Sequence, residues 1–152
     1  SKIISRDFAN QIPKNIDILK TLPGIGEYMS SAIASIAYNL PSKAVDTNIQ
    51  RVITRYFQLD FHNQTSNRKS VQDNVALLTS NDSPRDTIQG LMDLGSSLCT
   101  PKKPNCDWCP LKSGCHSHKN GTFEFALKKI KGFLINDLYP FFIIFTFFTL
   151  FT

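Results

Sequence analysis

The sequence has no cysteine outside residues 99–115, and its beginning shows no secretory signal. Residues Ser1 to Phe8 lack the basic start and the apolar run that such a signal requires. We therefore expect the protein in the cytoplasm or in another reducing compartment. In such a compartment, clustered cysteines serve as metal ligands more often than as disulfide partners.

Acidic residues are scarce in one segment, and this segment accounts for the net positive charge of the chain. Between Cys99 and Lys131, seven lysines stand against Asp107 and Glu124, whereas the rest of the chain has ten basic and ten acidic residues. A basic surface suits a polyanion, because each neutralised phosphate releases counterions. A solvated loop that needs its charges for solubility would show the same composition, so charge alone does not decide the partner.

The sequence also lacks an apolar run long enough to cross a bilayer as a helix. Its most apolar stretch, Tyr139 to Thr152, has 14 residues and six of the twelve phenylalanines. A helical span needs roughly 20 residues. The stretch could be the first strand of a truncated second domain, an interfacial anchor, or sequence unrelated to the native protein. We expect no membrane partner.

A β-strand pattern is missing before residue 120, and helical periodicity takes its place. Apolar spacing, capping residues and prolines predict five helices, at residues 15–22, 27–40, 47–57, 68–79 and 84–98. The polar stretch from Asn63 to Asn67 is predicted to be a loop. In the helix that Asp46 caps, Arg51 and Arg55 fall on a different face from the apolar residues. The chain is therefore predicted to be all-α.

A glycine turn separates the first two predicted helices. The first helix ends at Pro23, and Gly24-Ile25-Gly26 makes a tight turn. The start of the next helix presents unpaired backbone N–H groups, which can bind an anion such as a phosphate. A purely structural turn between helices has the same pattern, so the motif alone leaves both interpretations open.

All four cysteines lie in one loop, with the spacing Cys99-x6-Cys106-x2-Cys109-x5-Cys115. Thiolates held this closely repel one another and need a cation to neutralise them. Structural zinc sites commonly use two short cysteine pairs, and only one Cys-x2-Cys pair is present here. The spacing therefore favours a [4Fe-4S] cluster and leaves zinc as the alternative. His116 and His118 follow the loop, but four thiolates already complete a site.

Three motifs occur in an order that is typical of one family. They are Leu22-Pro23-Gly24-Ile25-Gly26, then Ala44-Val45-Asp46-Thr47-Asn48-Ile49-Gln50-Arg51-Val52, then Leu91-Met92-Asp93-Leu94-Gly95 leading into the cysteine loop. With them, roughly residues 1–120 resemble the endonuclease-III-like superfamily of helix-hairpin-helix DNA glycosylases. The closest similarity is to adenine DNA glycosylases, which remove adenine mispaired with 8-oxoguanine or guanine. The resemblance implies an all-α, partial helix-hairpin-helix glycosylase core with a C-terminal [4Fe-4S] cluster loop.

The resemblance also implies a division of the chain and a set of binding residues. Residues 1–98 would be an N-terminally truncated glycosylase region, 99–118 the cluster loop, and 119–152 a linker and apolar tail. The implied partner is double-stranded DNA with a mispaired adenine, bound by a monomer in the bacterial cytoplasm or another reducing compartment that contains DNA. The implied DNA-binding residues are Leu22, Gly24, Ile25, Gly26, Asn48, Lys102 and Lys103, and the implied cluster ligands are Cys99, Cys106, Cys109 and Cys115.

By the same resemblance, Asp46 is the catalytic aspartate and Tyr28 lies beside it. A carboxylate at a helix N-terminus is favoured in its ionised form and can stabilise a sugar oxocarbenium ion. From spacing alone, Asp46 is a simple helix cap. The related lyase-type enzymes carry a lysine eighteen residues before this aspartate, where this chain has Tyr28. Tyrosine cannot form an imine, so a monofunctional glycosylase is expected, although Thr47 is more typical of the lyase branch.

A glutamic acid that protonates the departing base is missing from this stretch of sequence. Before the hairpin the acidic residues are Asp7 and Asp17, and neither stands in the family's acid motif. We therefore expect this chain alone to have little or no activity. The alternatives are a lyase-type glycosylase for oxidised pyrimidines and a non-catalytic iron-sulfur DNA-binding module.

Overall fold

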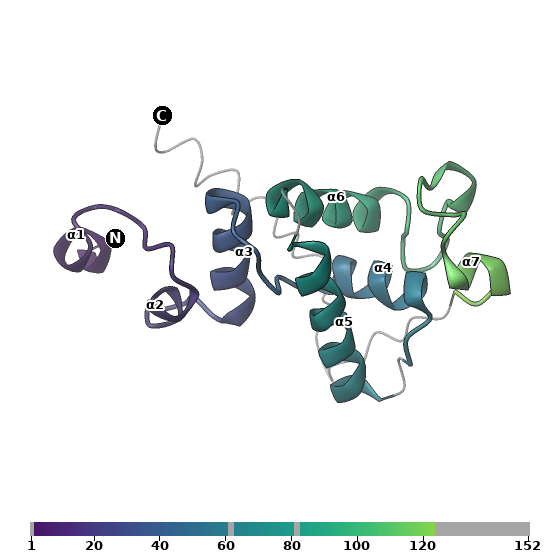
Figure 1. Cartoon of the computed structure of the whole chain (residues 1–152), viewed down its shortest axis with the longest axis horizontal. Coiled ribbons are helices and arrows are strands. Elements are labelled where there is room, and N and C mark those ends of the chain that lie inside the picture. The colour runs from purple at the N-terminus through teal and green to yellow at the C-terminus, as the bar shows by residue number, and fades with distance from the viewer. Residues whose placement is uncertain (1, 61–62, 81–82, 124–152) are drawn as a thin grey trace.

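The computed structural model describes residues 2–60, 63–80 and 83–123, and the regular elements in this part of the chain are all helices (Figure 1). The elements are α1 (Lys2–Asp7), α2 (Ile16–Lys20), α3 (Glu27–Tyr38), α4 (Thr47–Phe57), α5 (Gln64–Leu78), α6 (Pro84–Ser97), the 3-10 turn η1 (Cys106–Trp108) and α7 (His116–Asn120). No strand occurs in the described ranges, and the predicted all-α class is confirmed. The apolar stretch 139–152 lies outside the described residues.

Helix α4 is the centre of the described fold. It packs against α5 and α6 and contacts α7. Helix α3 packs against α6 and also contacts α2 (Figure 1). Apolar side chains of α4, α5 and α6 form the core because each helix turns one apolar face inward. Its fully buried members include Ile49 and Ile53 of α4, Val71 and Val75 of α5, and Ile88 of α6.

Close approach of α4 and α6 depends on a glycine. A Cβ atom added at Gly95 would lie 2.7 Å from the Cβ atom of Asn48, a distance that real side chains do not reach. The two backbones can therefore pack this tightly only with glycine at that position. This packing sets the position of the segment that follows α6, where the cysteines begin.

The predicted loop at Asn63–Asn67 is wrong, because α5 begins at Gln64. The side chain of Asn63 caps this helix by accepting a hydrogen bond from the backbone N–H of Ser66 at 3.1 Å. The amide of Asn67 is buried and accepts from Gln50 Nε2 at 3.1 Å. A polar turn is thus helical here because a cap and a tertiary hydrogen bond stabilise it.

Short helices at the two ends of the described chain, α1 and α7, were not predicted from the periodicity. Each has at most six residues, which is too short for a periodic pattern to register. In the described ranges no helix combines the length and the apolar character that crossing a bilayer would require.

Candidate active site and metal centre

Asp46 caps α4, as its position before the apolar run predicted. Its Oδ1 atom accepts a hydrogen bond from the backbone N–H of Ile49 at 2.7 Å, and the side-chain amide of Asn48 lies 3.4 Å from Oδ2. Burial raises the pKa of Asp46, and the hydrogen bonds from Ile49 and Asn48 lower it by less. The helix terminus does favour the ionised form, but desolvation of the carboxylate outweighs that effect.

Tyr28, in the first turn of α3, lies within electrostatic range of Asp46. Burial, followed by the nearby charge of Asp46, raises the pKa of Tyr28 to about 12. The phenol is therefore a neutral hydrogen-bond donor at physiological pH. Its hydroxyl is buried and has no hydrogen-bond partner among the described residues. A buried donor without a partner is costly and rare, and at such a position it marks a place where an acceptor can bind.

The hairpin between α2 and α3 holds the four predicted DNA-binding residues of the glycine motif. Leu22 is buried, and its carbonyl accepts from the N–H of Ile25 at 3.1 Å. Gly24 has a φ of +83°, which only glycine adopts without strain. Gly26 has ordinary backbone angles, and a Cβ atom added there would meet nothing within 4 Å. The protein's own packing therefore does not require glycine at position 26.

The remaining predicted DNA-binding residues lie in two different settings. Asn48 is half-buried, and its Oδ1 atom accepts from Arg51 Nη2 at 2.8 Å. Since its amide nitrogen faces Asp46, both ends of this side chain make contacts inside the protein. Lys102 and Lys103 are exposed in the loop after α6.

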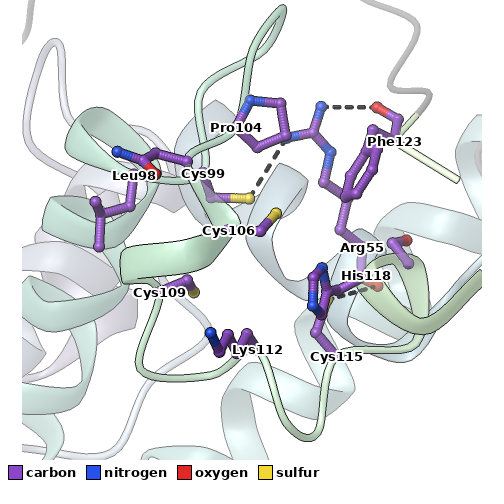
Figure 2. Close-up of a pocket in the computed structure, with 12 residues that line it drawn as sticks. Arg55, Leu98, Cys99, Pro104, Cys106, Cys109, Lys112, Cys115, His118 and Phe123 are labelled. Carbon is purple, nitrogen blue, oxygen red and sulfur yellow. Dashed lines mark hydrogen bonds between the residues drawn. The ribbon is translucent and has the colours of Figure 1, made fainter. Parts of the chain in front are cut away.

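The four cysteines line a single pocket (Figure 2). Cys99 follows α6, Cys106 and Cys109 bracket η1, and Cys115 precedes α7, so three short segments bring them together. Burial raises the pKa of the Cys106 thiol, and the other three cysteines raise it further because they lie within electrostatic range. Four soft donors around one space form a donor set that fits a thiophilic metal group. His118 also lines this pocket, whereas His116 is exposed.

Two arginines of α4 were not predicted to belong to the site. Arg51 and Arg55 are each 2% exposed. Arg51 donates to the carbonyls of Gly95 at 2.6 Å and Cys99 at 2.7 Å. Asp46, Asn48 and Arg51 thus form a hydrogen-bonded chain that reaches the backbone of the first cysteine. The available sequence signal was their shared position, one turn apart, on the face of α4 opposite to the apolar one.

This arrangement, a half-buried aspartate that caps a helix beside a helical hairpin and a four-cysteine loop, is typical of the helix-hairpin-helix class of DNA-binding enzymes. No family model matches the chain. It is 31% identical over 115 residues to a thymine/uracil-DNA glycosylase of Methanothermobacter thermautotrophicus, covering 76% of the chain and 52% of that protein. It is 38% identical over 110 residues to the adenine DNA glycosylase of Mycolicibacterium smegmatis, covering 72% of the chain and 37% of that protein.

Solved structures agree with these relatives. A thermostable thymine-DNA glycosylase matches with a TM-score of 0.67 and 28% identity, over 78% of this chain and 55% of that chain. An endonuclease III in a non-covalent complex with DNA matches with a TM-score of 0.59 and 24% identity, over 81% of this chain and 56% of that chain, and so shows the fold. The chain therefore belongs to the endonuclease-III-like family of helix-hairpin-helix DNA glycosylases.

The predicted similarity to adenine DNA glycosylases is confirmed, because several such enzymes are among the relatives. The chain spans about half the length of its thymine/uracil-specific relative and just over a third of the adenine-specific one.

Proposed function

We propose that the protein is a monofunctional glycosylase of base excision repair, which hydrolyses the N-glycosidic bond of adenine mispaired with 8-oxoguanine or guanine in double-stranded DNA. The observation that carries this proposal is the pairing of Asp46 with the unpartnered hydroxyl of Tyr28. A target base flipped out of the duplex would place its sugar beside these two groups.

Asp46 would supply the charge that the reaction needs. As the glycosidic bond breaks, positive charge develops on the sugar, and a buried carboxylate stabilises it strongly because little water screens the interaction. The neutral phenol of Tyr28 would donate a hydrogen bond to the substrate or to Asp46. Since position 28 carries no amine, no imine forms and the DNA backbone is not cleaved by lyase chemistry.

The general acid that protonates adenine is assigned to a part of the protein outside this chain. Asp7 and Asp17, the acidic residues before the hairpin, are both exposed. The hydrogen bond with Arg6 lowers the pKa of the Asp7 carboxyl, which makes it a poor proton donor. We therefore expect the 152-residue chain alone to release little or no adenine.

DNA would bind as a duplex to one copy of the protein, across the hairpin and the loop after α6. The start of α3 has no side-chain cap, which leaves its backbone N–H groups available for a phosphate. Gly26 keeps the approach to these groups open, and Lys102 and Lys103 add positive charge. The shape of this surface would be supported from the protein interior by Leu22, Ile25 and Asn48.

Cys99, Cys106, Cys109 and Cys115 would hold a [4Fe-4S] cluster. The four cysteines line one pocket. Their spacing contains a single Cys-x2-Cys pair, where structural zinc sites commonly use two short pairs, and this supports a cluster over a single zinc ion. When bound, the cluster would cross-link the loop covalently and could exchange an electron, and it requires the reducing compartment that the free cysteines suggest.

A single-turnover assay on defined duplexes tests the proposed activity. The substrates are A opposite 8-oxoguanine, A opposite G, T opposite G, U opposite G, and thymine glycol opposite A. We expect the longer gene product to release adenine from the first two and the 152-residue chain to release little from any of them. Adenine left in place by the longer protein would overturn the proposal.

Thymine or uracil removal from mispairs is the second candidate function. It is favoured by the relative from Methanothermobacter, of which the chain covers the larger share, and by the structural match with a TM-score of 0.67. If the same assay shows release of thymine or uracil opposite G, that base would replace adenine as the proposed substrate. Borohydride treatment separates both candidates from a lyase for oxidised pyrimidines, because only an imine is trapped as a covalent complex.

A further inference from the structure

Arg55 is a buried cation that pairs with no carboxylate among the described residues. The side chain is 2% exposed, and none of the ion pairs among the described residues involves it. Removing a guanidinium from water without an anionic partner costs several kcal/mol. Such a group is tolerated where another source of negative charge lies close by, and Arg55 lines the pocket of the four cysteines (Figure 2).

The contacts of Arg55 join the two ends of the cysteine loop. One guanidinium nitrogen, Nη1, lies 3.4 Å from Cys99 Sγ and 2.8 Å from the carbonyl of Thr100. The other, Nη2, donates to the carbonyls of Pro101 at 2.9 Å and Phe123 at 2.7 Å. The last cysteine also meets this residue, since Cys115 Sγ lies 3.6 Å from the carbonyl oxygen of Arg55.

One donor of Arg55 is left over. Its Nε–H is buried and has no hydrogen-bond partner in the described part of the chain. Buried donors nearly always have partners, so an acceptor is expected here that the described part of the chain does not provide. Sulfur atoms that carry negative charge are suitable acceptors at this pocket.

We propose that Arg55 is the built-in counter-charge of the four-cysteine site: it holds the first ligand, Cys99, by a charge-assisted N–H···S hydrogen bond and stabilises the thiolate-bound metal group. The inference rests on the proposed metal centre and adds a positioning residue to it. Hydrogen bonds to sulfur and nearby charge are the main means by which a protein sets the reduction potential of an iron-sulfur cluster. A cation at one corner raises that potential, because it favours the form that carries an additional electron.

The test compares Arg55→Met, which keeps the length of the side chain but removes charge and donors, with Arg55→Lys, which keeps the charge. Arg85→Met is the matched control. Arg85 also donates to backbone carbonyls, those of Ile36 and Ala37 in α3, but it is exposed and does not line the cysteine pocket. Each 152-residue chain is loaded anaerobically with iron and sulfide, and the melting temperature is measured with and without the metal group.

We expect Arg55→Met to lose iron to a chelator roughly 10–100-fold faster than the parent chain, the range found for partners of metal ligands. Its reduction potential should be more negative, and the gain in melting temperature on metal loading should shrink. Arg55→Lys should recover most of the potential. Arg85→Met should lower the melting temperature equally in both states and leave release and potential unchanged.

Equal losses of melting temperature with and without metal in Arg55→Met, together with unchanged release, would overturn the inference, because Arg55 would then be a purely structural tether. Failure of the cofactor assignment is distinguishable from this. A parent chain that takes up zinc in place of iron and sulfide would refute the cluster, and zinc release by the same variants would still decide the role of Arg55. A parent chain that binds neither metal would refute both.

Discussion

Each of the two residues proposed for catalysis is in an environment that lowers the stability of the folded protein. Asp46 is a carboxylate in a half-buried position, and burial raises its pKa. Tyr28 buries a hydroxyl that has no hydrogen-bond partner among the described residues. Both arrangements cost folding free energy, since a desolvated charge and an unpaired donor each lose interactions with water. Such costs at neighbouring residues are expected where a substrate completes the missing interactions.

Asp46→Asn should stabilise the fold at neutral pH and slow catalysis strongly. Asparagine caps a helix about as well as aspartate, and it buries no charge. The loss of a charge that stabilises the transition state should slow base release by on the order of 10²–10³-fold. Thermal unfolding and single-turnover kinetics of the active full-length protein measure the two effects. A destabilised variant would show that the charge of Asp46 supports the fold.

The same variant carries a pH signature with a definite sign. Because the folded pKa of Asp46 lies above its unfolded value of about 3.9, the native state binds the extra proton more tightly. The contribution of Asp46 to stability is therefore full below that unfolded value and is lost as the pH rises through the folded pKa. The stability advantage of Asp46→Asn should vanish at low pH and grow to a plateau as the pH rises.

Tyr28→Phe should leave stability unchanged or slightly higher, because no hydrogen bond within the described protein is lost. If the phenol donates to the substrate or to Asp46 during the reaction, base release should fall by roughly 10-fold, equivalent to about 1.4 kcal/mol. Urea unfolding of the chain and kinetics of the active protein check the two parts. A clear loss of stability would show that the hydroxyl has a partner in the folded protein.

Among the helices, some glycines are required by close packing and others face open space, where a ligand can approach. Gly95 of α6 is required by the contact with Asn48 of α4, whereas Gly26 at the start of α3 faces open space. Gly90 lies in α6 as well, and a Cβ atom there would also meet nothing within 4 Å. Packing within the described protein therefore requires glycine at position 95 but not at positions 26 and 90.

Gly95→Ala should destabilise the fold by about 1–3 kcal/mol, the usual cost of forcing a methyl group into a packed interface. Gly90→Ala is the matched control. It should stabilise by up to about 1 kcal/mol, since alanine is the better helix former at an open position. Chemical denaturation of both variants tests the pair, and equal effects would show that α4 and α6 do not approach as closely as described.

Gly26→Ala should leave the free energy of unfolding within about 0.5 kcal/mol of the parent value, as for other substitutions into open space. It should weaken binding to duplex DNA, because the added methyl group would stand where a phosphate is proposed to approach. Fluorescence anisotropy with a labelled duplex measures this. Unchanged affinity would remove the hairpin from the proposed DNA interface.

At the scale of the whole molecule, the cysteine loop depends on a ligand more than the helical core does. The core holds α3, α4, α5 and α6 together through buried apolar side chains. The loop from Cys99 to Cys115 is instead held by Arg51, Arg55 and a few backbone hydrogen bonds around four thiols. A bound metal group would cross-link the four cysteines, so the loop should lose order when that group is removed.

Removal of metal by a chelator should therefore change the loop first. Trp108 is the single tryptophan of the chain and lies between two of the cysteines, so its fluorescence reports on the loop alone. We expect a change in that fluorescence and faster proteolysis within residues 99–115, with most of the helical circular dichroism retained. A simultaneous loss of helicity would show that the core also depends on the metal group.

The helices of the core were predictable because local rules decide them. Gly24, the cap Asp46 and Pro84 at the start of α6 each act within one turn of chain, and they placed the hairpin, α4 and α6 to within a few residues. Local rules failed at Asn63–Asn67, where the buried amide of Asn67 and a partner from α4 stabilise the first turn of α5. A contact between distant segments cannot be read from either segment alone.

Motifs and spacing in the amino-acid sequence were enough to predict the all-α class, the family, the four clustered cysteines and the candidate aspartate. Three properties emerge only in the folded protein: Arg51 and Arg55 are buried against the cysteine loop, the hydroxyl of Tyr28 has no partner among the described residues, and burial raises the pKa of Asp46. Burial and charge environment are sums over neighbours from several segments, so they exist only once the chain has folded.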